Sequence, residues 1–222
     1  MSIELLEDLP LQYRLRPAKG VAKGLVILMH GVGSNETALA PLAAQLPEDL
    51  HVALVRSPIA IGPSAYCAFR VGFTANGPVI DAPAAEASRR LLADFIAQLQ
   101  ARLGIAPAKT IVAGFSQGGI MSAGLALTEP QLVQGFAIIS GRILPEIAPL
   151  IKAGKDLKHL SALIMHGTQD GTLPVAWADK SSEWLKALDI AFADKRYQAQ
   201  HEITQQMASD FVAWVSDTLK HD

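Results

Sequence analysis

Short apolar runs alternate along the chain with longer stretches in which apolar residues recur every three or four positions. A continuous apolar run is typical of a strand that is covered on both faces of its sheet. Such runs occupy residues 25–29, 52–55, 110–115, 136–140 and 162–165. Ahead of them, Leu11, Tyr13 and Leu15 alternate with polar residues, which predicts a half-buried strand.

The longer stretches have the spacing of amphipathic helices. The clearest covers residues 84–103, where Leu92, Phe95 and Leu99 fall on one face and Gly104 marks the end. Further helices are predicted over residues 37–46, 118–127, 177–188 and 204–219. This alternation predicts an α/β protein with a mostly parallel, doubly wound sheet flanked by helices. The strands are spaced too regularly for a second domain or a large cap, so we expect residues 1–222 to form one domain.

Residues 57–83 break this rhythm, because they contain no clear helix and four prolines punctuate them. Long irregular connections are uncommon in compact domains, and many of them are functional. Two interpretations are open for this segment: a substrate-binding loop, or a plain surface loop with a small hairpin.

Composition narrows the class of protein. Half of the 222 residues are hydrophobic, and Lys+Arg 19 against Asp+Glu 21 gives a net charge of −2. No stretch concentrates basic residues, so nucleic acid is not an expected partner. The single Cys67 cannot form an intrachain disulfide and is interpreted as a packing residue. The N-terminus lacks a signal peptide and no run reaches the length of a membrane span, so we expect a cytoplasmic protein without stable membrane insertion.

One motif carries nucleophilic chemistry. The segment from Gly114 to Gly118 reads G-x-S-x-G, and its Ser116 lies where an apolar strand turns into a helix. The two glycines let strand and helix approach closely, and the helix N-terminus favours an oxyanion beside the serine. The competing interpretation is an ordinary Gly/Ser-rich helix cap. The strand–turn–helix context favours a nucleophile elbow.

A serine nucleophile needs a base, which in this arrangement follows the acid in the chain. Four histidines come after Ser116. If His159 were the base, no suitable acid-bearing loop would follow a later strand. His166 ends an apolar run and is interpreted as structural. His221 is next to the C-terminus. His201 remains, between a predicted last strand and the last helix.

The acid is expected in a loop at the carboxyl end of a strand, where ligands gather in open α/β sheets. Asp170 follows the strand over residues 162–165 and meets this condition. A structural turn is the competing interpretation. Other carboxylates lie on or beside the next helix, or at the opposite end of the strand: Asp179, Glu183, Asp189 and Asp156.

The loop after the first buried strand contains Gly31, Val32 and Gly33. In the elbow arrangement, one oxyanion donor comes from such a loop and the other from the residue after the nucleophile. We therefore predict the backbone N–H groups of Val32 and Gln117 as the oxyanion hole, with His30 in a structural role. No H-E-x-x-H pair and no dinucleotide or phosphate fingerprint occurs, so neither a metal nor a cofactor is expected.

Together these motifs resemble the phospholipase/carboxylesterase family, which includes acyl-protein thioesterases. The resemblance spans nearly the whole chain, and GFSQGG at residues 114–119 is its most specific piece. The other matching segments are residues 28–33, 140–145, 166–174 and 197–203. The chain departs from the family at residues 66–70, where Tyr-Cys-Ala-Phe-Arg stands in place of a tryptophan-containing motif. The departure bears on the substrate pocket and leaves the triad residues untouched.

The resemblance implies an α/β-hydrolase without a large cap, acting as a serine esterase on carboxylic esters or thioesters. It implies Ser116, Asp170 and His201 as the catalytic triad. Of the pocket, Leu144 and Leu173 are implied by the resemblance, and we add Phe69 from the departing segment. The implied partners are a small-molecule ester or acyl substrate and a second copy in a homodimer.

Three other functions stay open alongside a simple carboxylesterase. One is acyl-protein thioesterase or lysophospholipase activity. Another is a non-catalytic binding protein on the same fold. The third is a different hydrolase, such as a peptidase. The side chain of Arg70 has two interpretations, a surface arginine or a contact for an anionic group.

Overall fold

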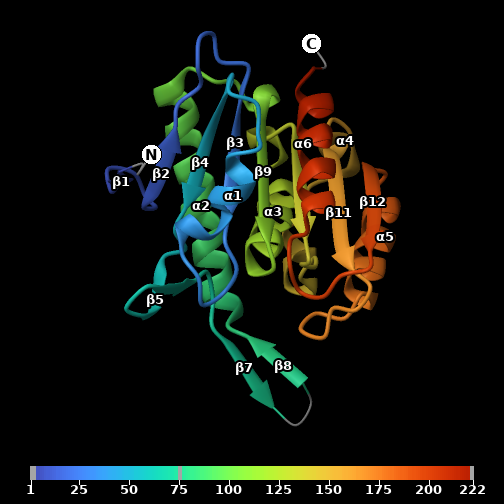
Figure 1. The fold of residues 1–222 in the computed structure, drawn as a ribbon. Helices are drawn as coiled ribbons and strands as arrows, with labels where there is room; N and C mark the ends of the chain where they lie inside the picture. The colour runs from blue at the N-terminus through green and yellow to red at the C-terminus, as the bar shows by residue number, and fades with distance from the viewer. Residues whose placement is uncertain (1–3, 75–76, 221–222) are drawn as a thin grey trace.

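The computed structural model describes residues 4–74 and 77–220, and an eight-stranded sheet runs through it (Figure 1). The strands in spatial order are β1 (Leu5–Leu6), β2 (Tyr13–Arg16), β4 (Leu50–Val55), β3 (Gly24–Met29), β9 (Thr110–Phe115), β10 (Gly135–Ile139), β11 (Ser161–Gly167) and β12 (Ala191–Tyr197). Strand β2 is antiparallel to both of its neighbours, and the strands from β4 to β12 are parallel. The prediction of a mostly parallel α/β sheet is confirmed.

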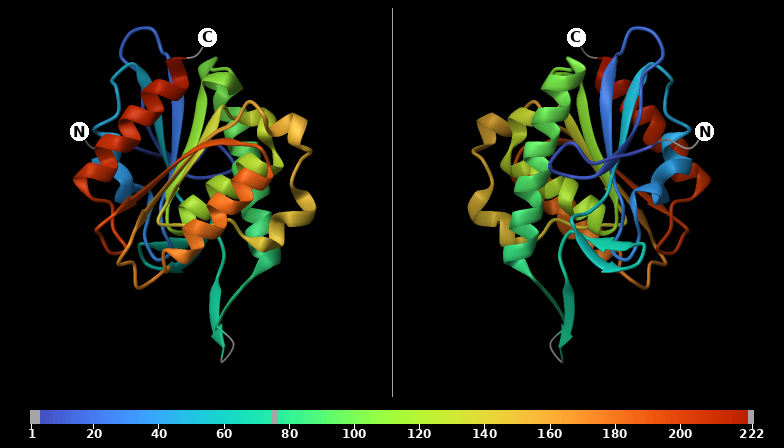
Figure 2. Two further views of the ribbon diagram at one scale, coloured as in Figure 1. Left: turned by 90° about the vertical axis from the view of Figure 1, so that its right-hand side faces the viewer. Right: turned by 90° about the vertical axis from the view of Figure 1, so that its left-hand side faces the viewer.

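Helices cover both faces of this sheet (Figure 2). On one face lie α2 (Ala82–Leu103), α3 (Gln117–Thr128) and α5 (Ala176–Ala187), whose apolar sides form one core cluster with the sheet. On the other face, α1 (Ala40–Ala43) and α6 (Gln205–Lys220) form a second cluster. The short remaining elements are η1 (Glu36–Leu39), η2 (Pro107–Lys109), η3 (Pro130–Leu132), η4 (Pro145–Leu150) and α4 (Gly154–Leu157). Two cores on opposite faces explain why inner parallel strands such as β3 and β10 are buried and apolar along their whole length, unlike the edge strand β12.

Helix α2 shows how local sequence sets the boundaries of an element. The side chain of Asp81 accepts a hydrogen bond from the N–H of Ala84, and Pro83 lies in the first turn, where its missing N–H is harmless. The helix ends at Gly104, which has φ +65° and returns its N–H to the carbonyl of Gln100. The predicted end at Gly104 is confirmed.

The helix predicted over residues 37–46 is wrong in type and extent. The chain forms the 3₁₀ turn η1 and then a single α-helical turn, α1. Asn35 caps η1 by accepting from the N–H of Thr37, and Pro41 at the start of α1 cannot continue the hydrogen bonds of the preceding turn. The apolar spacing that suggested a longer helix instead places Leu39 and Leu42 in the core.

The irregular segment contains two hairpins. The first pairs β5 (Ile59–Gly62) with β6 (Ala65–Cys67), and the second pairs β7 (Val71–Thr74) with β8 (Gly77–Ile80). In Figure 1 the second hairpin projects away from the body of the protein, beyond the carboxyl ends of the parallel strands. Between the hairpins, Ala68 and Phe69 are buried. The segment is therefore part exposed hairpin and part core.

No helix in the described part of the chain is both long enough and apolar enough to cross a membrane.

Candidate active site

Ser116 stands at a sharp turn between β9 and α3. Its backbone has φ +55° and ψ −117°, a conformation that non-glycine residues rarely adopt and that marks functional sites. The turn is possible because Gly114 and Gly118 carry no side chains, and the surrounding backbone leaves no room for any. A Cβ on Gly118 would overlap the carbonyl of Met29, and one on Gly114 would overlap the backbone of Gly118. The glycine spacing in the motif thus has a steric cause.

The structure brings the three predicted residues together from three different loops. The Oγ of Ser116 lies 3.0 Å from Nε2 of His201, and Nδ1 of His201 lies 2.7 Å from Oδ2 of Asp170. The side chain of Asp170 is fully buried, whereas that of His201 is 19% exposed. The ring of Phe115 packs against His201 with centroids 4.8 Å apart. The three side chains form a continuous hydrogen-bonded line from the buried carboxylate of Asp170 to the hydroxyl of Ser116.

Asp170 is held by more than His201. Its Oδ1 accepts from the backbone N–H groups of Thr172 at 2.9 Å and Leu173 at 2.8 Å. Burial by itself raises the pKa of this carboxyl, but the hydrogen bonds from His201 and the two N–H groups outweigh it and lower the pKa below the usual value. Asp170 therefore stays ionised at neutral pH, with one oxygen kept for His201.

His166 lies directly behind the same carboxylate. It is completely buried, its Nε2 is 2.7 Å from the carbonyl of Leu173, and the same atom is 3.3 Å from Oδ2 of Asp170. Burial lowers the pKa of His166, so the ring is neutral and its proton resides on Nε2, facing both oxygens. The structure agrees with the structural role inferred for this histidine.

The loop after β3 lies against the serine. A Cβ on Gly31 would be 3.3 Å from Cβ of Ser116, so the loop passes the serine at van der Waals distance. His30 is buried, accepts from the N–H of Ser57 at Nε2 and donates from Nδ1 to the carbonyl of Gly31. Burial lowers the pKa of His30, in keeping with this neutral ring. The hydrogen bonds of His30 thus hold the backbone of the loop in place.

Both predicted oxyanion donors border the same space as Ser116. The N–H of Gln117 is the first of helix α3 and has no acceptor within that helix. Val32 lines the same cavity as Gln117 and Ser116. A carbonyl oxygen held there would meet the positive end of the helix dipole as well as the N–H groups.

The Gln117 side chain has a role that sequence reasoning missed. Its Oε1 accepts from the N–H of Ala68 at 2.7 Å, and its Nε2 donates to the carbonyl of Phe69 at 2.9 Å. It thereby fixes the stretch between the two hairpins beneath the serine. On the other side, the N–H of Tyr66 donates to Ser34 at 2.8 Å and so connects β6 to the loop after β3. A glutamine in an otherwise small and apolar G-x-S-x-G turn was the available signal.

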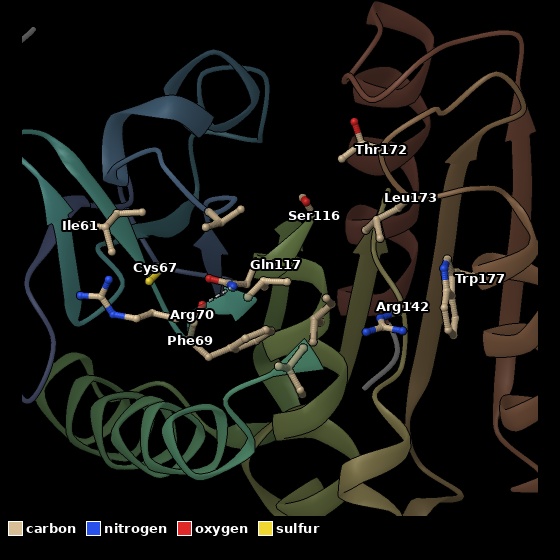
Figure 3. Close-up of a pocket in the computed structure, with 14 residues that line it drawn as sticks. Ile61, Cys67, Phe69, Arg70, Ser116, Gln117, Arg142, Thr172, Leu173 and Trp177 are labelled. Atoms are coloured by element: carbon tan, nitrogen blue, oxygen red, sulfur yellow. Dashed lines mark hydrogen bonds between the residues drawn. The ribbon is translucent and has the colours of Figure 1, made fainter. Parts of the chain in front are cut away.

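A cavity of about 470 Å³ opens beside Ser116 (Figure 3). Its apolar lining comes from both hairpins, from α3 and from the loop after β11. Phe69 and Leu173 line it as expected, together with Cys67, which is otherwise buried. Leu144 does not line it, which corrects the expectation for that residue. After β10 the chain turns Leu144 into the core, where it borders a separate cavity of about 70 Å³.

Two arginines also line this cavity. Arg70 is exposed on the side formed by the hairpins. Arg142 follows β10, is only 9% exposed and packs its guanidinium over the ring of Trp177, 4.1 Å from the centroid. Sequence reasoning missed Arg142. Its signal was a single charged residue inside the apolar stretch from Ile138 to Leu144, at the carboxyl end of a strand.

Among residues 4–74 and 77–220, no group of three or more His, Cys, Asp or Glu side chains is arranged to hold a metal ion.

The chain matches one protein family over nearly its full length. The sequence pattern of the phospholipase/carboxylesterase family matches residues 14–219. The chain is also 27% identical over 216 residues to an acyl-protein thioesterase 1 from Kluyveromyces lactis, covering 90% of this chain and 93% of that protein.

Solved structures show the same fold. A carboxylesterase from Mesorhizobium loti superimposes with a TM-score of 0.85 at 22% identity, covering 96% of this chain and 98% of the other. Esterase PE8 superimposes with a TM-score of 0.79 at 27% identity, covering 94% of this chain and 99% of the other. These likenesses confirm the α/β-hydrolase fold expected from the sequence.

Proposed function

Because the chain belongs to the phospholipase/carboxylesterase family, we propose that it is a serine hydrolase that cleaves carboxylic esters through an acyl-enzyme on Ser116. One observation carries the proposal. The Oγ of Ser116, the imidazole of His201 and the carboxylate of Asp170 form one hydrogen-bonded line with spacings of 3.0 Å and 2.7 Å. A serine that only caps a helix does not require an imidazole and a buried carboxylate hydrogen-bonded in line behind it.

In the first half of the reaction, Nε2 of His201 takes the proton from Oγ of Ser116 as Oγ bonds to the ester carbonyl carbon. The carbonyl electron pair moves to its oxygen, which the N–H groups of Val32 and Gln117 stabilise by roughly 3 kcal/mol each. The tetrahedral intermediate then collapses. The bond to the leaving alkoxide or thiolate breaks, and His201 returns the proton to that group.

In the second half, a water molecule takes the place of the alcohol. His201 removes one proton from the water, and the resulting oxygen attacks the acyl carbon. The second tetrahedral intermediate breaks its bond to Ser116, and His201 gives the proton back to Oγ. Asp170 keeps the Nδ1 proton of His201 in place throughout and stabilises the imidazolium that forms twice in the cycle.

The acyl-protein thioesterase among the relatives makes thioesters the second substrate class for this site. The same residues serve for both classes, because only the atom that leaves differs. A peptidase is the less favoured alternative, since an amine leaving group demands more complete protonation than an alkoxide or thiolate of lower pKa.

The test compares wild-type protein with S116A on p-nitrophenyl butyrate, on a thioester of the same acyl group and on the matching anilide. Ser209 on the exposed side of α6 provides the control substitution, S209A. We expect wild type and S209A to cleave the ester or the thioester, and S116A to lose nearly all of this activity. Unchanged turnover by S116A would contradict the proposal. Cleavage of the anilide at a rate similar to that of the ester would favour a peptidase.

A further inference from the structure

The side chain of Arg142 lies in the wall of the cavity that holds Ser116. It follows β10 directly, after Gly141, whose backbone passes so near the elbow that a Cβ there would be 2.8 Å from the carbonyl oxygen of Ser116. In the view of Figure 3, Arg142 and Trp177 lie on one side of Ser116, and Arg70 and Ile61 on the other. Arg142 therefore lines the same cavity as Ser116, on the side away from Arg70.

Among the described residues, no hydrogen bond or ion pair compensates for the burial of this guanidinium. Arg142 is only 9% exposed, and its Nε has no hydrogen-bond partner in the described part of the chain. No ion pair joins it to a carboxylate within the described ranges 4–74 and 77–220. Burial lowers the pKa of Arg142, and the charge of Glu146 partly offsets this effect. A guanidinium nevertheless stays protonated in proteins, so the cavity contains a largely desolvated cation.

A buried cation without a partner destabilises the folded protein. Such violations of the ordinary rules of burial are typical of functional sites. The ring of Trp177 covers one face of the guanidinium. Because the N–H groups of a guanidinium point outward in its plane, stacking leaves them available for two parallel hydrogen bonds to an oxyanion.

The rest of the cavity favours the same kind of ligand. Of the side chains that line it, two are cationic, none is acidic and most are apolar. The apolar surface suits a hydrocarbon chain, and Arg142 supplies a fixed charge within it. Building on the hydrolase function proposed above, we infer that the preferred substrate is an ester whose chain carries a carboxylate, which Arg142 binds.

The experiment compares matched esters that differ only in this charge. p-Nitrophenyl hydrogen adipate and p-nitrophenyl hexanoate have acyl chains of equal length, and only the first carries a carboxylate. p-Carboxyphenyl hexanoate and phenyl hexanoate place the charge on the leaving group instead. The measured quantity is the ratio of kcat/KM for the charged ester to that for the neutral ester, which cancels any general effect of a substitution on the catalytic groups.

For one of the two pairs, wild-type protein should favour the charged ester, and R142M should lower the ratio by roughly 10- to 100-fold, the usual worth of a hydrogen-bonded contact between charged groups. R142K should keep part of the preference, because an ammonium retains the charge without the planar fork. Thermal unfolding checks that R142M is folded. Removing an unpaired buried cation should not lower its stability.

The control is the same type of substitution at Arg70, on the opposite wall of the cavity. R70M removes a charge from the same cavity but from an exposed side chain, and it should change the ratio by less than about threefold. A loss confined to R70M would overturn the role given to Arg142. A wild-type ratio near one for both pairs, unchanged in folded R142M, would overturn the inference and leave the hydrolase proposal standing. No turnover of any of the four esters, with no reaction of Ser116 toward a fluorophosphonate, would overturn both.

Discussion

Replacing Asp170 by asparagine changes the proton pattern of the site while keeping its shape. The side-chain amide can lie in two ways, and the contacts decide between them. With its oxygen at the Oδ1 position, the amide still accepts from Thr172 and Leu173, and its NH2 group faces His201 and the more distant Nε2–H of His166. The reverse orientation would set the NH2 group against two N–H donors at 2.8 to 2.9 Å. The first orientation is therefore favoured.

In that orientation the NH2 group donates to Nδ1 of His201, where the carboxylate accepted. His201 must then hold its own proton on Nε2, and that atom donates toward Ser116 rather than accepting from it. A wrong tautomer of this kind reduces kcat by about 10⁴-fold in serine hydrolases. We expect D170N to lower kcat/KM on p-nitrophenyl butyrate by roughly 10³- to 10⁴-fold, or about 4 to 5 kcal/mol.

The assay is release of p-nitrophenolate by wild type, D170N and a control, with thermal unfolding of each. Asp217 is the control, since its side chain is 72% exposed and pairs with Lys220 on the surface of α6. D217N should have the activity of wild type, and D170N should remain folded. A loss of less than tenfold in folded D170N would contradict this prediction, because His201 would then keep the right tautomer without a carboxylate.

Three further predictions concern other parts of the structure. Burial raises the pKa of Glu36, but hydrogen bonds from Arg56 and a second arginine outweigh this and lower the pKa to about 2. This shift contributes about 3 kcal/mol to the free energy of unfolding, which is present above pH ~4.5 and lost as the pH falls toward 2. Urea unfolding of E36Q at neutral pH should therefore show a free energy of unfolding lower by this amount. The stability of E36Q should also depend less on acid pH than that of wild type. G118A should abolish activity or folding, because the new methyl group overlaps the carbonyl of Met29, and circular dichroism with an esterase assay tells which. Q117A keeps the N–H of Gln117 but frees the segment that its side chain holds, so KM should rise by more than kcat falls; a fall in kcat alone would contradict this role.

The residues of the proposed triad could be predicted because the position of each follows from the order of strands and loops along the chain. Parallel strands end at one edge of the sheet, so loops that follow β9, β11 and β12 must meet there whatever their exact length. Ser116, Asp170 and His201 lie in those loops. The glycine pattern around Ser116 is local too, since it records the contact between a strand and the helix that follows it.

The residues that sequence reasoning missed depend on contacts between distant segments. The side chain of Gln117 binds the backbone 48 and 49 residues away, and although the motif contains a polar glutamine, it does not indicate which segment that side chain contacts. The role inferred for Arg142 depends on its contact with Trp177 and on its place in the cavity, and the sequence around Arg142 indicates neither. The helix over residues 37–46 was wrong because apolar spacing does not distinguish a 3₁₀ turn followed by one α-helical turn from a continuous helix. The homodimer and the cytoplasmic location stay predictions.

The most direct test of the account is labelling of the purified protein with a fluorophosphonate, followed by intact-mass and peptide mass spectrometry. The reagent bonds covalently only to a serine oxygen that a neighbouring base activates. We expect a single adduct on Ser116 in wild type, no adduct in S116A and strongly reduced labelling in H201A. An adduct on another serine, or no labelling of folded wild-type protein, would contradict the claim that Ser116 and His201 form an active nucleophile.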